Sequence, residues 1–314
     1  MAFDTLLGND RLKENLISSL SRGHVSHFYL ISGPAGSGKH TLARLLAAAI
    51  LCKDSRRPCG SCGACRKVLA NNHPDFITVE DPEHKTVAVR IVREMREDMF
   101  IRPNEADYKI YLFPQELGTE GQNALLKILE EPPSYGVFIL LADNPEKLLP
   151  TVRSRCTELA LQALPEEILK AALGREYPDA SEEDIHGAVL RSGGFLGQAR
   201  DLLSGAGGTP QTEGFVRAYA GRDALALVQV LVPMEKWKRD QLIEVLEQWL
   251  FLLENALASR AGLPAVSSLE RTLGTQRSSQ ELMRGVRSIQ KALEYARGNV
   301  SPAAICGWLR WELK

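Results

Sequence analysis

The sequence predicts an α/β domain built on a parallel sheet, followed by a half that is entirely helical. Three observations lead to this prediction: short apolar runs fill the first half, helical patterns separate them, and no such run occurs after about residue 163. Strands that are apolar at consecutive positions are typical of a parallel sheet covered by helices on both faces. At roughly 150 residues per domain, the chain has room for two or three domains.

The apolar runs are the expected strands of the first domain. They lie at residues 27–32, 76–79, 110–113, 138–141 and 157–161. A helix is expected over 122–129, and it ends before Pro132 and Pro133 because proline cannot continue the hydrogen-bond ladder. These elements define an α/β domain over residues 1–162.

The second half is predicted to hold a small helical domain, 163–206, and a helical bundle, 207–314. Short helices are expected over 165–173 and 181–191, with Ser181 as the N-cap of the second, and a third runs through Leu203. The segment 204–210 has the composition of a linker. Beyond it, a long helix carries an apolar stripe formed by Leu242, Val245, Leu246, Trp249, Leu252 and Leu253. The tryptophans are interpreted as core or subunit-contact anchors: Trp237, Trp249, Trp308 and Trp311.

Composition and charge exclude several classes of protein. Hydrophobic residues make up 44% and charged residues 25%, which excludes disordered and collagen-like chains. With a net charge of -1, the chain as a whole is not an electrostatic nucleic-acid binder, so any such role is local or shared. The longest apolar stretch, 42–52, is interrupted by Arg44 and is too short for a membrane span. No secretory signal pattern is present, so the cytoplasm is the expected compartment.

A cluster of cysteines gives the first chemical signal. Four of the six cysteines fall within fourteen residues: Cys52, Cys59, Cys62 and Cys65. In a reducing compartment, thiolates clustered in this way are typical of a structural zinc ion held tetrahedrally. An iron–sulfur cluster and a set of free thiols are the alternatives. Cys156 and Cys306 are isolated and are interpreted as small buried apolar residues.

A phosphate-binding loop follows the first expected strand. Gly33, Gly36 and Gly38 allow backbone amides to surround an anion, and the Ala- and Leu-rich helix that follows favours negative charge at its start. Lys39 is placed to reach the outer phosphates. The order strand, loop, helix predicts a phosphate-loop fold, whereas the sequence leaves open whether a nucleotide binds.

Two groups that ATP hydrolysis requires are replaced. His40 stands where a Ser or Thr hydroxyl would ligate magnesium, and Thr41 lies about 100° further around the helix. After the strand at 110–113, Pro114 and Gln115 stand where an acidic pair would hold the metal and polarise water. Glu116 is interpreted as a surface glutamate, so no intrinsic hydrolysis is expected.

Taken together, these motifs resemble those of the AAA+ subunits of the bacterial sliding-clamp loader. The residues that carry the resemblance are the cysteine insert, SGPAGSGK at 32–39, NHPDF at 72–76, NALLK at 123–127, LEEPP at 129–133 and NPEKLLPTVRSRC at 144–156. The resemblance covers residues 30–160, and the layout extends it to a helical lid domain (163–206) and a helical collar domain (207–314).

The resemblance implies a subunit of the DNA polymerase III clamp loader, which loads the sliding clamp onto primed DNA. The implied partners are motor subunits of gamma/tau type and a delta-type subunit, with the sliding clamp as a further candidate, DNA reached through the complex and no membrane. No catalysis by the chain itself is expected, although the assembly belongs to the DNA polymerase III holoenzyme. The implied trans-acting catalytic residue is Arg155, an arginine finger for the neighbouring subunit's γ-phosphate.

Departures from the pattern favour the non-hydrolysing, delta-prime type over the motor type. Ala142 and Asp143 stand where a motor subunit senses the γ-phosphate with threonine, and Gly197 stands where it carries arginine. The alternative is an ATP-hydrolysing motor subunit in which Thr41 and Glu116 handle magnesium. A third hypothesis, a DNA-reading cysteine insert, is disfavoured because no aromatic residue lies between Cys52 and Cys65 for a base to stack on.

Overall fold

A computed structural model describes residues 3–84, 86–205, 209–298 and 300–313 of the chain. The chain forms two compact units. Unit 1 contains Met1–Leu164 with Phe195–Gly197, and unit 2 contains Pro165–Gly194 with Gln198–Lys314. The finer division of the helical half into lid and collar stays a prediction, and its boundary at 206–207 lies outside the described residues.

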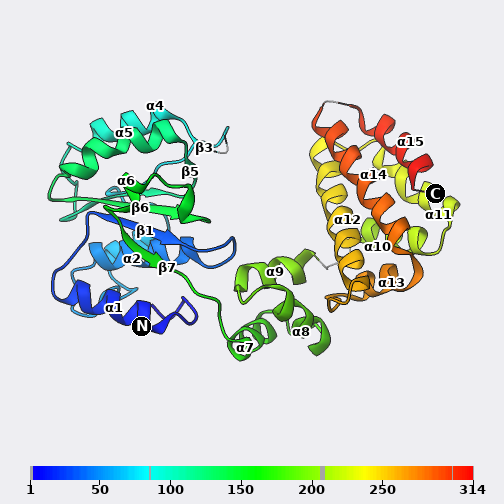
Figure 1. The fold of residues 1–314 in the computed structure, drawn as a ribbon, viewed down its shortest axis with the longest axis horizontal. Coiled ribbons are helices and arrows are strands. Elements are labelled where there is room, and N and C mark those ends of the chain that lie inside the picture. The colour runs from blue at the N-terminus through cyan, green and yellow to red at the C-terminus, as the bar shows by residue number, and fades with distance from the viewer. Residues whose placement is uncertain (1–2, 85, 206–208, 299, 314) are drawn as a thin grey trace. The chain divides into compact units, whose positions relative to one another are not determined.

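Unit 1 is built on a five-stranded sheet whose neighbouring strands run parallel, as the sequence predicts (Figure 1). The order across the sheet is β2-β4-β6-β1-β7. The strands are β1 (Phe28–Ser32), β2 (Phe76–Thr78), β4 (Lys109–Phe113), β6 (Gly136–Ala142) and β7 (Thr157–Ala160). Central strands β1, β4 and β6 are buried at every position, which explains why their sequences are apolar apart from Ser32 and Lys109 at strand ends. Strand β7 lies at an edge, and among its residues only Leu159 is buried.

Helices cover both faces of this sheet, so consecutive residues of β1 enter different cores (Figure 1). Tyr29 and Ile31 pack with α1 (Asp10–Ser21), α2 (Lys39–Leu51) and α3 (Gly63–Leu69). Phe28 and Leu30 pack with α4 (Val89–Asp98), α5 (Thr119–Glu130) and α6 (Pro150–Arg153). Helix α5 contains the expected helix at 122–129 and begins three residues earlier, after Gly118.

Sequence patterns missed two short strands that form a second sheet. β3 (Thr86–Val87) pairs in parallel with β5 (Glu116–Leu117). Two-residue strands are too short to show a periodic pattern, so they cannot be recognised from local sequence. A 3-10 turn, η1 (Pro145–Lys147), follows β6, with the Asn144 side chain as its cap.

Unit 2 contains only helices among its described residues. They are α7 (Glu166–Glu176), α8 (Glu182–Arg191), α9 (Leu196–Gly205, which starts in unit 1), α10 (Pro210–Ala220), α11 (Ala224–Met234), α12 (Arg239–Arg260), α13 (Ser268–Gln276), α14 (Ser279–Arg297) and α15 (Pro302–Glu312). The Ser181 hydroxyl accepts the Asp184 N–H at the start of α8, so the expected N-cap is present. The expected linker at 204–210 is wrong at its ends, because Ser204 and Gly205 close α9 and Pro210 opens α10. Residues 206–208 lie outside the described residues.

Trp249 anchors the core of the helical bundle. It is fully buried on α12 and stacks on Phe215 of α10 with ring centroids 4.1 Å apart. The expected apolar stripe of α12 is buried along its length. Trp237 and Trp308 pack partly buried against this core, whereas Trp311 is 75% exposed and is therefore not a core residue. Within the described residues, no helix has the length and apolar character that crossing a membrane requires.

The start of α14 is fixed by a reciprocal cap. The Ser278 hydroxyl accepts the Glu281 N–H at 3.3 Å, and the Glu281 carboxylate accepts the Ser278 N–H at 2.8 Å. Arg277 and Arg222 both donate to the same carboxylate, at 2.7 and 2.8 Å. These contacts, the Ser278 amide first, lower the pKa of Glu281 to about 2.

We expect Glu281→Gln to lower the free energy of unfolding at pH 7 by about 1 kcal/mol, the usual scale for a helix cap. Because the folded pKa of about 2 lies below the ordinary 4.5, the carboxylate stabilises the fold above pH 4.5, and this contribution is lost as the pH falls toward 2. Urea unfolding should show that the difference in unfolding free energy between Glu281→Gln and wild type becomes smaller as the pH falls over that range. Glu294→Gln, on an exposed position of α14, is the control. An equal effect of both variants would contradict the assignment.

Candidate functional site

The phosphate loop joins the end of β1 to the start of α2. Gly36 and Gly38 have φ angles of 76° and 97°, in the left-handed region that glycine adopts without strain. Gly38 is the N-cap residue of α2, and Lys39 is the first residue of that helix. The structure therefore brings the glycines and the lysine of the expected loop together at a helix N-terminus.

Lys39 is the most constrained charge of the loop. Its side chain is 7% exposed, and its ammonium donates to the backbone oxygens of Gly33 at 2.7 Å and Pro34 at 2.8 Å. The same nitrogen forms an ion pair with Asp143 Oδ1 at 2.7 Å. An ammonium has three N–H donors, so these three acceptors match its full capacity.

The residues beside Lys39 do not supply a magnesium hydroxyl at its expected place. The pKa of His40 is lowered by desolvation and by the neighbouring charges of Lys39 and Arg44, so the imidazole is neutral at pH 7. A neutral imidazole is a poor ligand for Mg²⁺, which prefers oxygen. Thr41 is an exposed residue of the first turn of α2.

The positions after β4 have structural partners. The Gln115 side chain accepts the Asp81 N–H at 2.7 Å and donates to the backbone oxygens of Asp81 and His84. Glu116, in β5, forms an ion pair with Lys147 at 2.7 Å. Where a hydrolysing site would present a carboxylate pair, this chain thus has Pro114 and an amide that holds a loop, and the carboxylate of the next residue, Glu116, is paired with lysine.

Arg155 lies just after α6, at the surface of unit 1. One guanidinium nitrogen donates to the Thr151 backbone oxygen at 2.8 Å, and the other pairs with Glu130 Oε1 of α5 at 3.1 Å. The side chain keeps 38% of its surface exposed. Burial raises the pKa of the adjacent Cys156 thiol to about 12, although this cysteine, interpreted from the sequence as buried, is only partly buried.

Gly197, which belongs to unit 1, lies against the phosphate loop. Its N–H donates to the Gly36 backbone oxygen at 2.9 Å. A Cβ atom at this position would come within 2.4 Å of Gly36 Cα. The backbone here leaves no room for the arginine of the motor-type pattern.

The four clustered cysteines converge on one point between α2 and α3. Their Sγ atoms all lie within 4.8 Å of one another, with Cys52 and Cys62 at 3.8 Å and Cys59 and Cys65 at 4.0 Å. Four sulfurs around a single zinc ion, each about 2.3 Å from it, lie about 3.8 Å apart, so the donor set fits one tetrahedral ion. Iron–sulfur clusters place several metal ions between the thiolates and need wider spacing.

Backbone amides support these sulfurs. The Cys62 N–H donates to Cys59 Sγ at 3.3 Å, and the Cys65 N–H donates to Cys62 Sγ at 3.4 Å. Donation by the Cys62 and Ser61 amides lowers the pKa of Cys59 to about 6, whereas burial raises that of Cys65. Such hydrogen bonds hold metal ligands in orientation.

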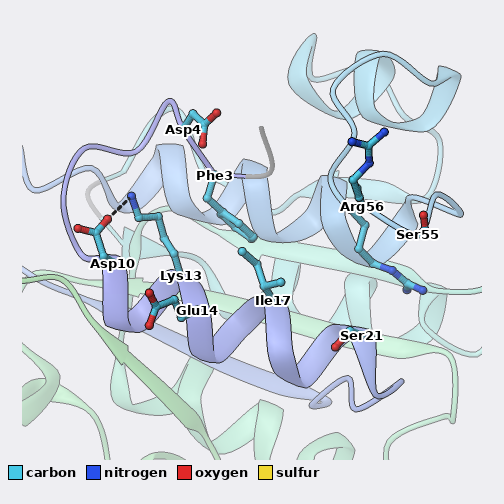
Figure 2. A pocket seen from close by; sticks show the side chains of 10 residues that line it. Phe3, Asp4, Asp10, Lys13, Glu14, Ile17, Ser21, Ser55 and Arg56 are labelled. Carbon is cyan, nitrogen blue, oxygen red and sulfur yellow. Dashed lines mark ion pairs between the residues drawn. The ribbon is translucent and has the colours of Figure 1, made fainter.

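Two cavities that the sequence did not indicate lie along α1. The first, of about 430 Å³, lies between α1 and the cysteine insert, where Phe3 and Ile17 face each other and an Asp10–Lys13 ion pair of 2.8 Å closes one end (Figure 2). The second, of about 1080 Å³, lies between α1 and the edge strand β7. The lining residues include parts of α1, the insert and β7 together with neighbouring segments, and no residue of the loop 33–39 is among them.

Comparison with known proteins shows which proteins the α/β half of the chain resembles. Residues 8–165 match the model of a protein family described as DNA polymerase III, delta subunit. The Mycobacterium tuberculosis H37Rv protein "DNA polymerase III subunit gamma/tau" is 35% identical over 210 residues, which cover 65% of this chain and 36% of that protein. "DNA polymerase III subunit tau" of Salmonella typhimurium is 35% identical over 209 residues, covering 64% and 32%.

Only about a third of each of these relatives is therefore matched by this chain. A crystal structure of a gamma-subunit-related protein from Thermotoga maritima aligns over 95% of this chain and 100% of its own, with 17% identity and a TM-score of 0.43. The predicted fold class, a parallel α/β domain with a phosphate loop followed by helices, is confirmed by the sheet and helices described above. Since the family model covers half of its length, the chain belongs to the DNA polymerase III clamp-loader family.

Proposed function

We propose that this chain is a non-hydrolysing, delta-prime-type subunit of the DNA polymerase III clamp loader, which helps to load the sliding clamp onto primed DNA. The observation that carries the proposal is the state of the phosphate loop. Lys39, the group that would hold the outer phosphates, is bound by two loop carbonyls and by Asp143. The magnesium and water-polarising positions hold His40, Pro114 and Gln115, which supply neither the hydroxyl nor the carboxylates of a hydrolysing site.

In this proposal Arg155 acts on a neighbouring subunit. Its guanidinium stands at the surface, held by the Thr151 carbonyl and by Glu130. An exposed pair of this kind is worth little in stability, so exchanging Glu130 for a phosphate of the neighbour costs little. A planar guanidinium matches phosphate oxygens in two parallel hydrogen bonds, as an arginine finger requires.

We also propose that the cysteine cluster holds a structural zinc ion. Bound there, the ion would supply a cross-link between Cys52, at the end of α2, and Cys65, in the first turn of α3. All four positions are taken by cysteine, which leaves no ligand position open for substrate. The site therefore stabilises the insert and takes no part in chemistry.

The second candidate is an ATP-hydrolysing motor subunit. It is favoured by the names of the 35% identical relatives, which are gamma/tau and tau subunits. For this function Glu116 would have to leave Lys147 and Thr41 would have to reach the metal. Asp143 would also have to release Lys39.

Steady-state ATP hydrolysis by the purified chain separates the two candidates. We expect magnesium-dependent turnover no higher than that of Lys39→Ala, because His40, Pro114 and Gln115 supply neither the hydroxyl nor the carboxylates that hold magnesium and polarise water. Turnover that requires magnesium and disappears in Lys39→Ala would establish the motor function instead.

Arg155→Ala should lower the DNA-stimulated ATPase of the reconstituted loader. Arginine fingers contribute about 10³ to 10⁵ in rate, so the ATPase site that Arg155 serves should become inactive. The ATPase rate of the loader should then fall by the contribution of that one site. Size-exclusion chromatography should show normal assembly. Arg153→Ala is the control, because Arg153 is the neighbouring arginine and pairs with Glu146. A mutant loader with full activity would remove Arg155 from catalysis.

Metal analysis tests the cysteine site. We expect about one zinc ion per wild-type chain and much less in Cys59→Ser, since a tetrahedral site loses affinity with any ligand. Cys156→Ser, a cysteine outside the cluster, should keep its zinc. Iron in place of zinc, or unchanged metal in Cys59→Ser, would contradict the assignment.

A further inference from the structure

Asp143 is held beside the phosphate loop by the sheet. β1 and β6 pair in register, with Ser32 opposite Ala142, and the Gly33 N–H donates to the Ala142 backbone oxygen at 3.2 Å. Asp143 is the next residue after β6, so the pairing of the two strands places its carboxylate at the mouth of the loop. The position of this charge is thus fixed by backbone geometry rather than by a mobile surface segment.

The carboxylate is bound to Lys39, the group that a phosphate loop uses to reach the outer phosphates. The Lys39 ammonium gives two of its donors to the loop carbonyls of Gly33 and Pro34 and the third to Asp143. Lysine binds phosphate as a point charge, and a carboxylate oxygen at 2.7 Å satisfies the same donor. The ammonium has no donor left for a ligand while Asp143 is bound.

The rest of the loop keeps features of an anion site. The amides at the start of the 13-residue helix α2 lie next to the ion pair. Ser37 Oγ is buried in the loop and has no hydrogen-bond partner among the described residues. A donor with no partner inside a glycine loop suits an anion larger than one carboxylate.

We propose that the loop 33–39 is a phosphate-type anion site whose resident ligand is the carboxylate of Asp143. The side chain excludes the phosphates of nucleoside diphosphates and triphosphates by taking the third donor of Lys39 and by placing a negative charge where theirs would lie. The inference rests on the proposed function only in treating the loop as one that does not turn over ATP. The inference concerns the binding of nucleotide phosphates, and Asp143 is the residue that prevents this binding.

Asp143 is open to displacement from the solvent side, because its side chain is 60% exposed while Lys39 is 7% exposed. Removing the carboxylate therefore frees a buried ammonium that must find another anion. We expect Asp143→Asn, which keeps the shape and removes the charge, to bind pyrophosphate and ADP at least about tenfold more tightly than wild type.

Isothermal titration calorimetry with pyrophosphate and with ADP, each with and without magnesium, measures this gain. Pyrophosphate carries no nucleobase. An equal increase in affinity for pyrophosphate and ADP would therefore show that the phosphates are responsible for the increase. Asp143→Ala should share the gain, and Asp143→Glu, which keeps the charge, should not. Adding Lys39→Ala to Asp143→Asn should abolish it. Asp107→Asn is the matched control, an exposed carboxylate that lies 3.8 Å from Lys53.

Equal affinity of wild type and Asp143→Asn for both ligands, whether weak or tight, would overturn the proposal. So would a gain that survives Lys39→Ala. Hydrolysis is assayed separately on the same proteins, so the two ideas fail independently. A wild-type chain that turns over ATP contradicts the proposed function, whereas a non-hydrolysing chain with unchanged binding in Asp143→Asn contradicts only the role of Asp143.

Discussion

The parallel pairing of β1 with β6 is the constraint on which the rest of unit 1 depends. Because both strands end at the same edge of the sheet, the loop after β1 and the turn after β6 must lie side by side. This pairing brings Lys39 to Asp143. β6 also leads through η1 and α6 to Arg155. The segment of this chain that we propose to contact the neighbouring subunit therefore begins at the same edge of the sheet.

Helix α2 links the phosphate loop to the cysteine cluster. Lys39 opens the helix and Cys52 ends it, with most of the intervening residues buried against the sheet. A buried helix is a rigid connection, so anchoring Cys52 in a metal site would also fix the axis along which the loop amides point. The cluster can in this way support the loop without touching it, which gives a structural site a physical reason to lie in this domain.

Several residues around the phosphate loop are engaged in structural contacts. Gln115 binds the 81–84 loop, Glu116 binds Lys147, and Gly197 packs its backbone on Gly36. Gln115 and Gly197 thus have structural partners where the motor-type pattern has groups that act on ATP, and the neighbouring Glu116 is paired as well. The family model assigns the family, whereas the function follows from the groups present at the site.

The sequence by itself determined the strands, the parallel sheet, the loop and the cysteine spacing, because each is written in local patterns of apolar, glycine and cysteine residues. It missed β3 and β5, because a strand of two residues is too short to show a periodic pattern. It also misplaced the ends of the linker at 204–210. Only the tertiary structure decided that Asp143 meets Lys39, that Arg155 rests on Glu130 and that Trp311 is exposed while Trp249 is buried. These contacts join residues far apart in the chain, and strand register and helix packing, rather than local propensity, bring them together.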